Sequence, residues 1–380
     1  MATSIIGVVL VHIALDDISK FLKEGLLKDR FNFENESFEQ CKDLQTNDYS
    51  VNIPMRYYYK GKFRKGWENI VNPFRGTWVV GTPGSGKTFS IIESFIRQHS
   101  EKGFALVLYD YKFPSLATKL YFHYPKNPSY LLIANDPEME SIIGALNALI
   151  LNRLVTRVNT GQGKNIPTSI IVDELPTLYF HKIDRLIGTA RSNKVSVTLG
   201  FQELPQLEAD YGKVGMQKII TTVGNVVSGS ARSKETLEWL SSDIFGKVVQ
   251  LKKGVTIDRD KTSINLNENM DSLVPASKIS DMPTGWICGQ TARDFVKTKT
   301  GRDGSMNIQE SEEFKTSKFY CKTDFNMADI KKEEDGYVAL PKFYTFKSRD
   351  ERERILYKNF VQVGEDVKSM INTIQRYKVK

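Results

Sequence analysis

Residues 81–88 read Gly-Thr-Pro-Gly-Ser-Gly-Lys-Thr and lie between two apolar runs. The run before them, 77–80, is typical of a buried strand, and the run after them, 89–92, is typical of the start of a helix. The glycines allow backbone N–H groups to converge on phosphate oxygens, and the N-terminal end of the helix adds positive potential. The pattern predicts a strand, a phosphate-binding loop and a helix in that order, and a bound nucleoside triphosphate.

Each residue of this loop has an expected role. Lys87 is expected to reach the β- and γ-phosphates of ATP, and the Thr88 hydroxyl is expected to coordinate Mg²⁺. The other loop residues are expected to surround the phosphates: Gly81, Thr82, Pro83, Gly84, Ser85 and Gly86. The alternative is a tight turn without a ligand, and a chance match to the full pattern is rare in a chain of this size.

Composition places the chain among globular proteins. Its 380 residues are 40% hydrophobic and 26% charged, enough for a sizeable core and long for one small domain. The net charge of +8 favours an acidic partner such as nucleic acid or an anionic membrane. The cysteines, Cys41, Cys288 and Cys321, are odd in number and widely separated, so they indicate neither a disulfide framework nor a zinc site.

The N-terminus contains an apolar run at 5–15 that includes His12. A membrane-spanning helix needs about 20 such residues, and the run has neither a basic flank nor a small-residue cleavage site. We therefore expect an amphipathic helix that continues through Ile18, Phe21 and Leu22, and no transmembrane anchor.

The rest of the chain alternates strand and helix patterns. Short apolar runs predict strands at 104–109, 129–134, 169–172, 195–201, 225–228 and 248–251. Apolar residues at helical spacing predict helices at 137–158 and 234–240. Such alternation is typical of a mostly parallel sheet. We expect an α/β fold, a RecA-like P-loop NTPase core whose sheet is covered by helices on both faces.

Changes in pattern suggest three regions. Residues 1–70 are expected to form an N-terminal extension, with the amphipathic helix followed by a β-rich segment. Residues 71–296 are expected to form the ATPase motor domain. A Gly-, Lys- and Asp-rich stretch begins the region 297–380, which we expect to be a charged C-terminal extension, either a docking tail or a small subdomain.

A second motif is the apolar run 169–172 followed by Asp173 and Glu174. Beside a phosphate-binding loop, Asp173 is expected to hold Mg²⁺ through its water shell, and Glu174 to activate the attacking water as general base. An acidic pair after an apolar run otherwise marks a strand leaving the core. The pair favours ATP hydrolysis over the single-acid layout of kinases or GTPases.

Two further polar residues are candidates for the site. Gln202 follows the predicted strand 195–201 at its C-terminal end, where its amide can contact the γ-phosphate or the lytic water. Arg191 is expected in the turn before that strand, where it can act on a neighbouring subunit's nucleotide as an arginine finger. The alternatives are a solvated glutamine and a plain surface charge.

These residues belong to a set of motifs that resembles the type IV secretion coupling proteins of bacterial conjugation, closest to the mobilisation type. The motifs lie between roughly residues 50 and 295, at 70–76, 172–177, 190–191, 199–207, 211–212, 227–230, 234–236, 274–279 and 282–285. The resemblance implies an ATPase of the additional-strand class that assembles as a homo-hexamer, with nucleotide between neighbouring subunits. It also implies that the ring moves single-stranded DNA and an attached relaxase toward a type IV secretion channel, at the cytoplasmic face of the bacterial inner membrane.

The chain departs from that family in two respects. Members usually carry N-terminal transmembrane helices, and an all-helical domain between the lysine-bearing loop and the acidic strand. Here no spanning helix is expected, and predicted strands and helices of the sheet nearly fill the stretch between Lys87 and Asp173. Membrane association is therefore expected through partners or through an anchor missing from this sequence.

Other functions fit the same motifs. A double-stranded DNA translocase of the chromosome-segregation or end-resection kind shares the core, as does a phage-assembly ATPase. A non-catalytic docking platform would bind nucleotide only to assemble. The basic run 60–65, next to tyrosines at 57–59, is a candidate DNA contact or simply a solvated face.

Overall fold

The computed structural model describes residues 7, 15, 37–123, 125–136, 138, 140–158, 166–178, 183–257, 262–292, 317–341 and 346–378. The chain divides into two compact units, Met1–Val338 and Ala339–Lys380, which we treat separately. Apart from positions 7 and 15, the N-terminal helix expected over 5–22 lies outside the described residues, as does the stretch 297–305.

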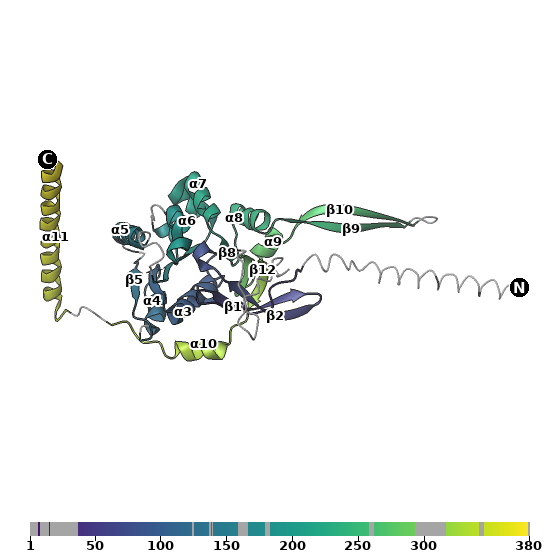
Figure 1. The fold of residues 1–380 in the computed structure, drawn as a ribbon, viewed down its shortest axis with the longest axis horizontal. Coiled ribbons are helices and arrows are strands. Elements are labelled where there is room, and N and C mark those ends of the chain that lie inside the picture. The colour runs from purple at the N-terminus through teal and green to yellow at the C-terminus, as the bar shows by residue number, and fades with distance from the viewer. Residues whose placement is uncertain are drawn as a thin grey trace, which may run out of the picture. The chain divides into compact units, whose positions relative to one another are not determined.

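The first unit is built on a ten-stranded sheet in the order β2-β1-β12-β11-β8-β3-β7-β6-β4-β5 (Figure 1). The strands are β1 (Val51–Tyr59), β2 (Lys62–Ile70), β3 (Thr77–Val80), β4 (Ala105–Asp110), β5 (Tyr130–Ala134), β6 (Thr168–Val172), β7 (Val195–Phe201), β8 (Asn225–Ser228), β11 (Trp286–Gln290) and β12 (Lys318–Thr323). The six strands from β8 to β5 pair in parallel, and the four from β2 to β11 pair antiparallel. The expected α/β fold with a mostly parallel central sheet is confirmed.

Helices connect the strands and cover both faces. They are η2 (Thr88–Ile92), α3 (Glu93–Glu101), α4 (Ser115–Phe122), α5 (Glu140–Val158), α6 (Ile183–Asn193), α7 (Leu204–Thr222), α8 (Lys234–Glu238), η4 (Trp239–Ile244), α9 (Ala276–Ser280) and α10 (Met327–Glu334). Short 3-10 turns lie at η1 (Pro73–Arg75) and η3 (Leu175–Thr177).

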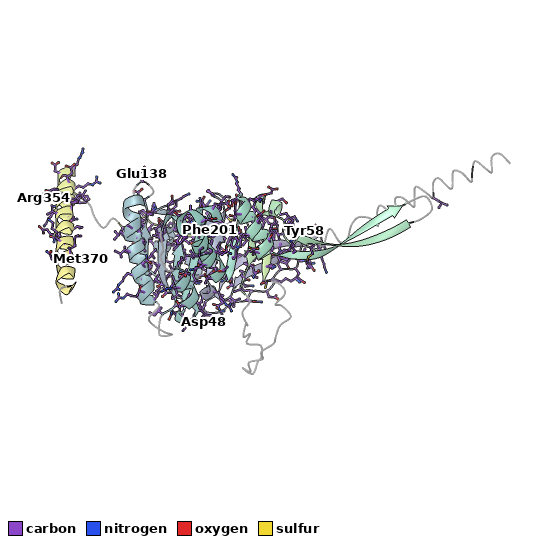
Figure 2. The ribbon with its side chains drawn as sticks, turned by 90° about the horizontal axis from the view of Figure 1, so that it is seen from above. Asp48, Tyr58, Glu138, Phe201, Arg354 and Met370 are labelled. Atoms are coloured by element: carbon purple, nitrogen blue, oxygen red, sulfur yellow. The ribbon has the colours of Figure 1, made fainter. Side chains whose placement is uncertain are left out.

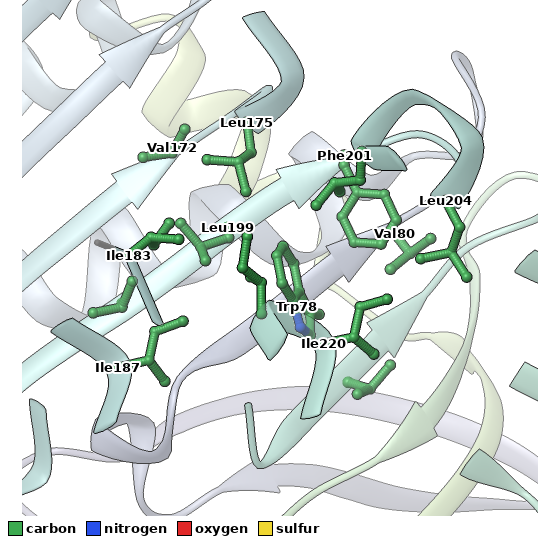
Figure 3. Packing of buried hydrophobic residues seen from close by; sticks show 14 of the residues in the cluster. Trp78, Val80, Val172, Leu175, Ile183, Ile187, Leu199, Phe201, Leu204 and Ile220 are labelled. Carbon is green, nitrogen blue, oxygen red and sulfur yellow. The ribbon is translucent and has the colours of Figure 1, made fainter. Parts of the chain in front are cut away.

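Two apolar clusters, one on each face, hold the helices to the sheet. Side chains alternate between the two faces along each strand, so Trp78 and Val80 belong to one cluster and Val79 to the other. The first cluster packs against α5, α6 and α7. Figure 3 labels members of this cluster from α6 and α7, among them Ile187 and Ile220. The second packs against η2, α3 and α4. The central strands are therefore buried on both sides, which explains why β3, β6, β7 and β8 contain no charged residue.

The main sheet crosses both domain boundaries expected from the sequence. The hairpin β1–β2 comes from the region 1–70, and β12 comes from the region 297–380, yet both pair within the same sheet as the phosphate-binding strand. β12 lies between β11 and β1. The three-region division does not describe how the backbone pairs.

The expected strand at 248–251 does not belong to this sheet. It forms part of β9 (Lys247–Ile257), which pairs antiparallel with β10 (Thr262–Ser272) as a separate two-stranded sheet (Figure 1). The physical reason is that β11 pairs with β8 on the side away from β3, which leaves no free edge there.

The second unit contains the helix α11 (Arg349–Lys378). Within the described ranges, no helix combines the length and apolar character that crossing a bilayer requires.

Candidate active site

The strand order gathers the predicted site residues, apart from Arg191, at one edge of the sheet. β7 lies between β3 and β6, and all three run parallel. At its C-terminal end β3 leads into the loop 81–88, β7 leads into Gln202, and β6 leads into Asp173 and Glu174. Ligands of open parallel sheets bind outside this edge, so the topology places these groups where a nucleotide would bind.

The glycine-rich loop has the backbone that its sequence predicts. Gly84 has a φ of 83° and Gly86 a φ of 89°, a left-handed conformation that side chains disfavour. The loop ends directly at η2, whose first residue is Thr88. The chain therefore turns sharply from β3 into a helix N-terminus.

Two other segments hold the loop in place. The Thr82 backbone N–H donates to the Ser230 carbonyl at 2.9 Å, and the Gly229 N–H donates to Val80 at 2.8 Å. On the other side, the Thr284 hydroxyl donates to the Gly84 carbonyl at 2.9 Å. The sequence motifs at 227–230 and 282–285 had suggested no role for these residues, and their position in the site follows only from the fold.

The catalytic candidates converge on one carboxylate oxygen. The Lys87 ammonium lies 3.2 Å from Oε2 of Glu174, and the Gln202 amide donates to the same oxygen at 3.1 Å. The side chains of Lys87 and Glu174 are only 11% and 7% exposed. The lysine, the glutamate and the glutamine thus form a compact, largely desolvated group beside the phosphate-binding loop.

Asp173 lies next to this group and is also buried. Its Oδ1 makes no hydrogen bond to any residue that the structure describes. Burial raises the pKa of Asp173 to about 6; Lys87 opposes the shift, and the charge of Glu174 adds to it. A buried carboxylate with a raised pKa and one oxygen free of hydrogen bonds is well suited to a cation.

Mg²⁺ fits this arrangement. It usually keeps several waters and is held by one or two carboxylates together with substrate phosphates. Asp173 and the Thr88 hydroxyl would be its protein-side contacts, as the sequence predicts. No group of three or more His, Cys, Asp or Glu side chains suited to a metal ion occurs in the described ranges, and a phosphate-bound Mg²⁺ does not need one.

Arg191 is not where the sequence suggested. It lies in the last turn of α6 rather than in a turn, and it is exposed. Helix α6 leads into the N-terminal end of β7, whereas Gln202 follows the C-terminal end of that strand. Because the two residues lie at opposite edges of the sheet, Arg191 is separated from the Lys87 group of its own chain.

Sequence reasoning also missed Glu203, the residue after Gln202. Its carboxylate accepts hydrogen bonds from the backbone N–H groups of Arg232 at 2.7 Å and Ser233 at 3.3 Å. It also accepts from the Ser233 hydroxyl at 2.9 Å. The loop that supports the phosphate-binding segment is therefore tied to the strand end that carries Gln202.

The basic run 60–65 forms the turn of the β1–β2 hairpin and the first part of β2. Lys60 Nζ and the Arg64 guanidinium lie 5.2 and 5.5 Å from the centre of the Tyr59 ring. Contact with DNA at this turn remains a prediction.

Comparison with known proteins connects the site to one family. Residues 167–284 match the family model described as the TraM recognition site of TraD and TraG. No curated protein sequence matches the chain.

Solved structures with a similar fold include the bacterial conjugative coupling protein TrwBdeltaN70 in its unbound monoclinic form. It is 13% identical, with a TM-score of 0.49 over 58% of this chain and 83% of that chain. The plasmid coupling protein TrwB in complex with ADP and Mg²⁺ is 18% identical, with a TM-score of 0.37 over 45% and 38%. The genome packaging NTPase B204 from Sulfolobus turreted icosahedral virus 2, in complex with AMPPCP, is 14% identical, with a TM-score of 0.36 over 57% and 92%.

The segment that matches the family model begins just before β6 and ends at Thr284, so it includes Asp173, Glu174 and Gln202. Over these residues, the resemblance to the conjugative coupling proteins that the sequence motifs indicated is confirmed.

Proposed function

We propose that this chain is an ATP-hydrolysing motor that moves DNA. The observation that carries the proposal is the shared contact of Lys87 and Gln202 with one oxygen of Glu174, at the edge of the sheet where the phosphate-binding loop ends. The three side chains come from three different strand ends, and their meeting is what a hydrolytic site requires.

The geometry suggests how the site would work. Triphosphate oxygens would compete for the Lys87 ammonium and draw it from Glu174. Freed of the lysine, Glu174 would accept a proton from the attacking water, and Gln202 would orient that water or the γ-phosphate. Mg²⁺, held through Thr88 and Asp173, would neutralise charge on the phosphates.

The DNA-moving part of the proposal rests on the family match and on charge. A net charge of +8 suits a polyanion bound through its phosphates without sequence preference. We propose single-stranded DNA with its relaxase as cargo, a homo-hexameric ring as the working form, and the type IV secretion channel at the cytoplasmic face of the inner membrane as the destination.

The test measures ATP hydrolysis without DNA, with single-stranded DNA and with double-stranded DNA, together with the mass of the assembly by light scattering. Single strands should stimulate the rate more than duplex, and Lys87→Ala should abolish turnover while leaving the fold intact. Greater stimulation by duplex would favour the double-stranded DNA translocase. No turnover in the wild-type chain would favour the nucleotide-dependent docking platform.

Arg191 is proposed to act on a neighbouring subunit, because it lies away from the Lys87 group of its own chain. Mixing Arg191→Ala subunits with Lys87→Ala subunits should recover activity, since some interfaces would then combine an intact arginine with an intact lysine. If mixed rings form and activity stays at the level of the single variants, Arg191 has no role in trans.

A further inference from the structure

The helix α11 carries an apolar stripe with a regular seven-residue repeat. In the sequence the stripe continues at alternating steps of four and three residues, at Leu356, Phe360, Val363, Val367, Met370, Ile374 and Tyr377. The first five side chains of the stripe are between 48% and 76% exposed. Figure 2 draws α11 with its side chains, including Met370 on the stripe. A helix on the surface of a globular protein does not normally leave so long a row of large apolar side chains exposed to water.

The period of the stripe identifies the kind of surface that covers it. A helix that lies on a sheet needs an apolar face that follows 3.6 residues per turn. An apolar stripe that repeats every 3.5 residues on average stays in register only with another helix wound around it. The repeat runs through three heptads, the length from which a coiled coil is expected.

The positions that flank the stripe favour a second copy of the same helix. In a parallel pair, positions 352, 359, 366 and 373 flank the stripe on one side and face positions 357, 364, 371 and 378 of the partner, which flank it on the other. Charged residues occur at these flanking positions only as Arg352, Asp366 and Lys378, which would face Tyr357, Ile371 and Thr373 respectively. No like charges meet, so nothing in the pattern opposes self-pairing. We propose that α11 pairs with α11 of a second copy of this chain in a parallel, in-register coiled coil, an interaction separate from nucleotide binding.

Site-specific disulfide formation in the full chain tests the proposal. The background is Cys41→Ser, because Cys288 and Cys321 are buried and Cys41 is partly exposed. Val363→Cys places a thiol on the stripe, and Glu365→Cys places one on the opposite side of the helix. Val363→Cys should form a disulfide-linked dimer under mild oxidation, and Glu365→Cys should form roughly tenfold less, because cysteines with Cα atoms more than about 7 Å apart cannot be bridged.

A matched pair of substitutions checks that the stripe drives the contact. Val367→Asp, on the stripe, should reduce the Val363→Cys dimer by about tenfold or more, because it buries a charge in the seam. Val361→Asp makes the same change off the stripe and should leave the dimer unchanged. Far-UV circular dichroism confirms that the helix persists in each variant.

Several results would overturn the proposal. Equal cross-linking at positions 363 and 365 would mean random collision of copies that the motor core alone brings together. A cysteine at 363 that does not cross-link would mean that another segment of the chain, such as residues 5–22, covers the stripe, or that nothing does. None of these outcomes depends on ATP hydrolysis, so the test is independent of the proposed motor function.

Discussion

Replacing Glu174 with glutamine should separate nucleotide binding from hydrolysis. In the structure Lys87 is held by Glu174 at 3.2 Å, and both side chains are largely buried. At an effective dielectric constant of about 20, two unit charges at that separation attract by roughly 5 kcal/mol before desolvation is subtracted. Hydrogen bonds to charged groups contribute about 1.5–3 kcal/mol net, and neutral ones about 1 kcal/mol.

The substitution leaves a neutral hydrogen bond in place of the ion pair, so nucleotide phosphates would compete for Lys87 against a weaker partner. A difference of about 1.4 kcal/mol corresponds to roughly tenfold tighter binding of ATP. Hydrolysis should fall by about 10² to 10⁴, the usual contribution of a general base. The assay compares binding of a non-hydrolysable ATP analogue by calorimetry with phosphate release in the same preparation.

The matched control is Glu93→Gln. Glu93 is a buried glutamate that pairs with Lys119, on α3 and α4, and its side chain is 6% exposed. This variant should bind and hydrolyse ATP like the wild type. If Glu174→Gln binds the analogue no more tightly than the wild type, Lys87 is not restrained by Glu174. If it also retains normal turnover, Glu174 is not the base.

Two further predictions concern stability and pH. Asp173→Asn should raise the free energy of unfolding at pH 7 by about 3 kcal/mol, because burial raises the pKa of Asp173 to about 6 and the charged form destabilises the fold. In denaturant titrations this gain should disappear as the pH falls from 6 to 4, and a gain that persists at pH 4 would contradict the assignment. Burial lowers the pKa of His99 to about 3, so the folded state favours the neutral imidazole. The contribution of His99 to the free energy of unfolding is therefore complete above pH 6.5 and falls by about 2 kcal/mol by pH 5. His99→Gln should flatten that decline, and an unchanged slope would show that another group causes it.

The central strands could be predicted because their residue types reflect burial on both faces of the sheet. The strands expected at 195–201 and 225–228 have those bounds in the structure, and the one at 104–109 is displaced by one residue. Each is buried on both faces, and none of the three expected ranges contains a charged residue, so no solvent-facing position interrupts the pattern.

The antiparallel strand β12 could not be predicted in the same way. Its buried residues, Phe319 and Cys321, alternate with residues that remain partly or fully exposed, and a lysine stands near each end. Such a segment after a polar stretch resembles a charged tail. Apolar and polar residues do alternate with a period of two in this segment, but over too few residues to distinguish a strand from a loop.

For the site, the sequence predicted which strand ends carry functional groups but not how they connect. The loops at 229–233 and 284–285 are distant in sequence from the phosphate-binding loop, and only the completed sheet brings them to it. The position of Arg191 was misjudged because helix α6 continues to Asn193, two residues before β7 begins.

The place of β12 in the sheet has a consequence for how the protein is made. Among the described strands, β1 pairs only with β2 and β12, so the β1–β2 hairpin has no inner neighbour until the ribosome has made β12. The segment before β1 depends on β12 as well: the Gln40 side chain donates to the Tyr320 carbonyl and accepts from the Tyr320 N–H, 280 positions away. During synthesis the open edge of β1 is a template for wrong pairing, and a chaperone or fast late translation would shorten that exposure. A version of this protein shortened at residue 296 would keep that edge open permanently.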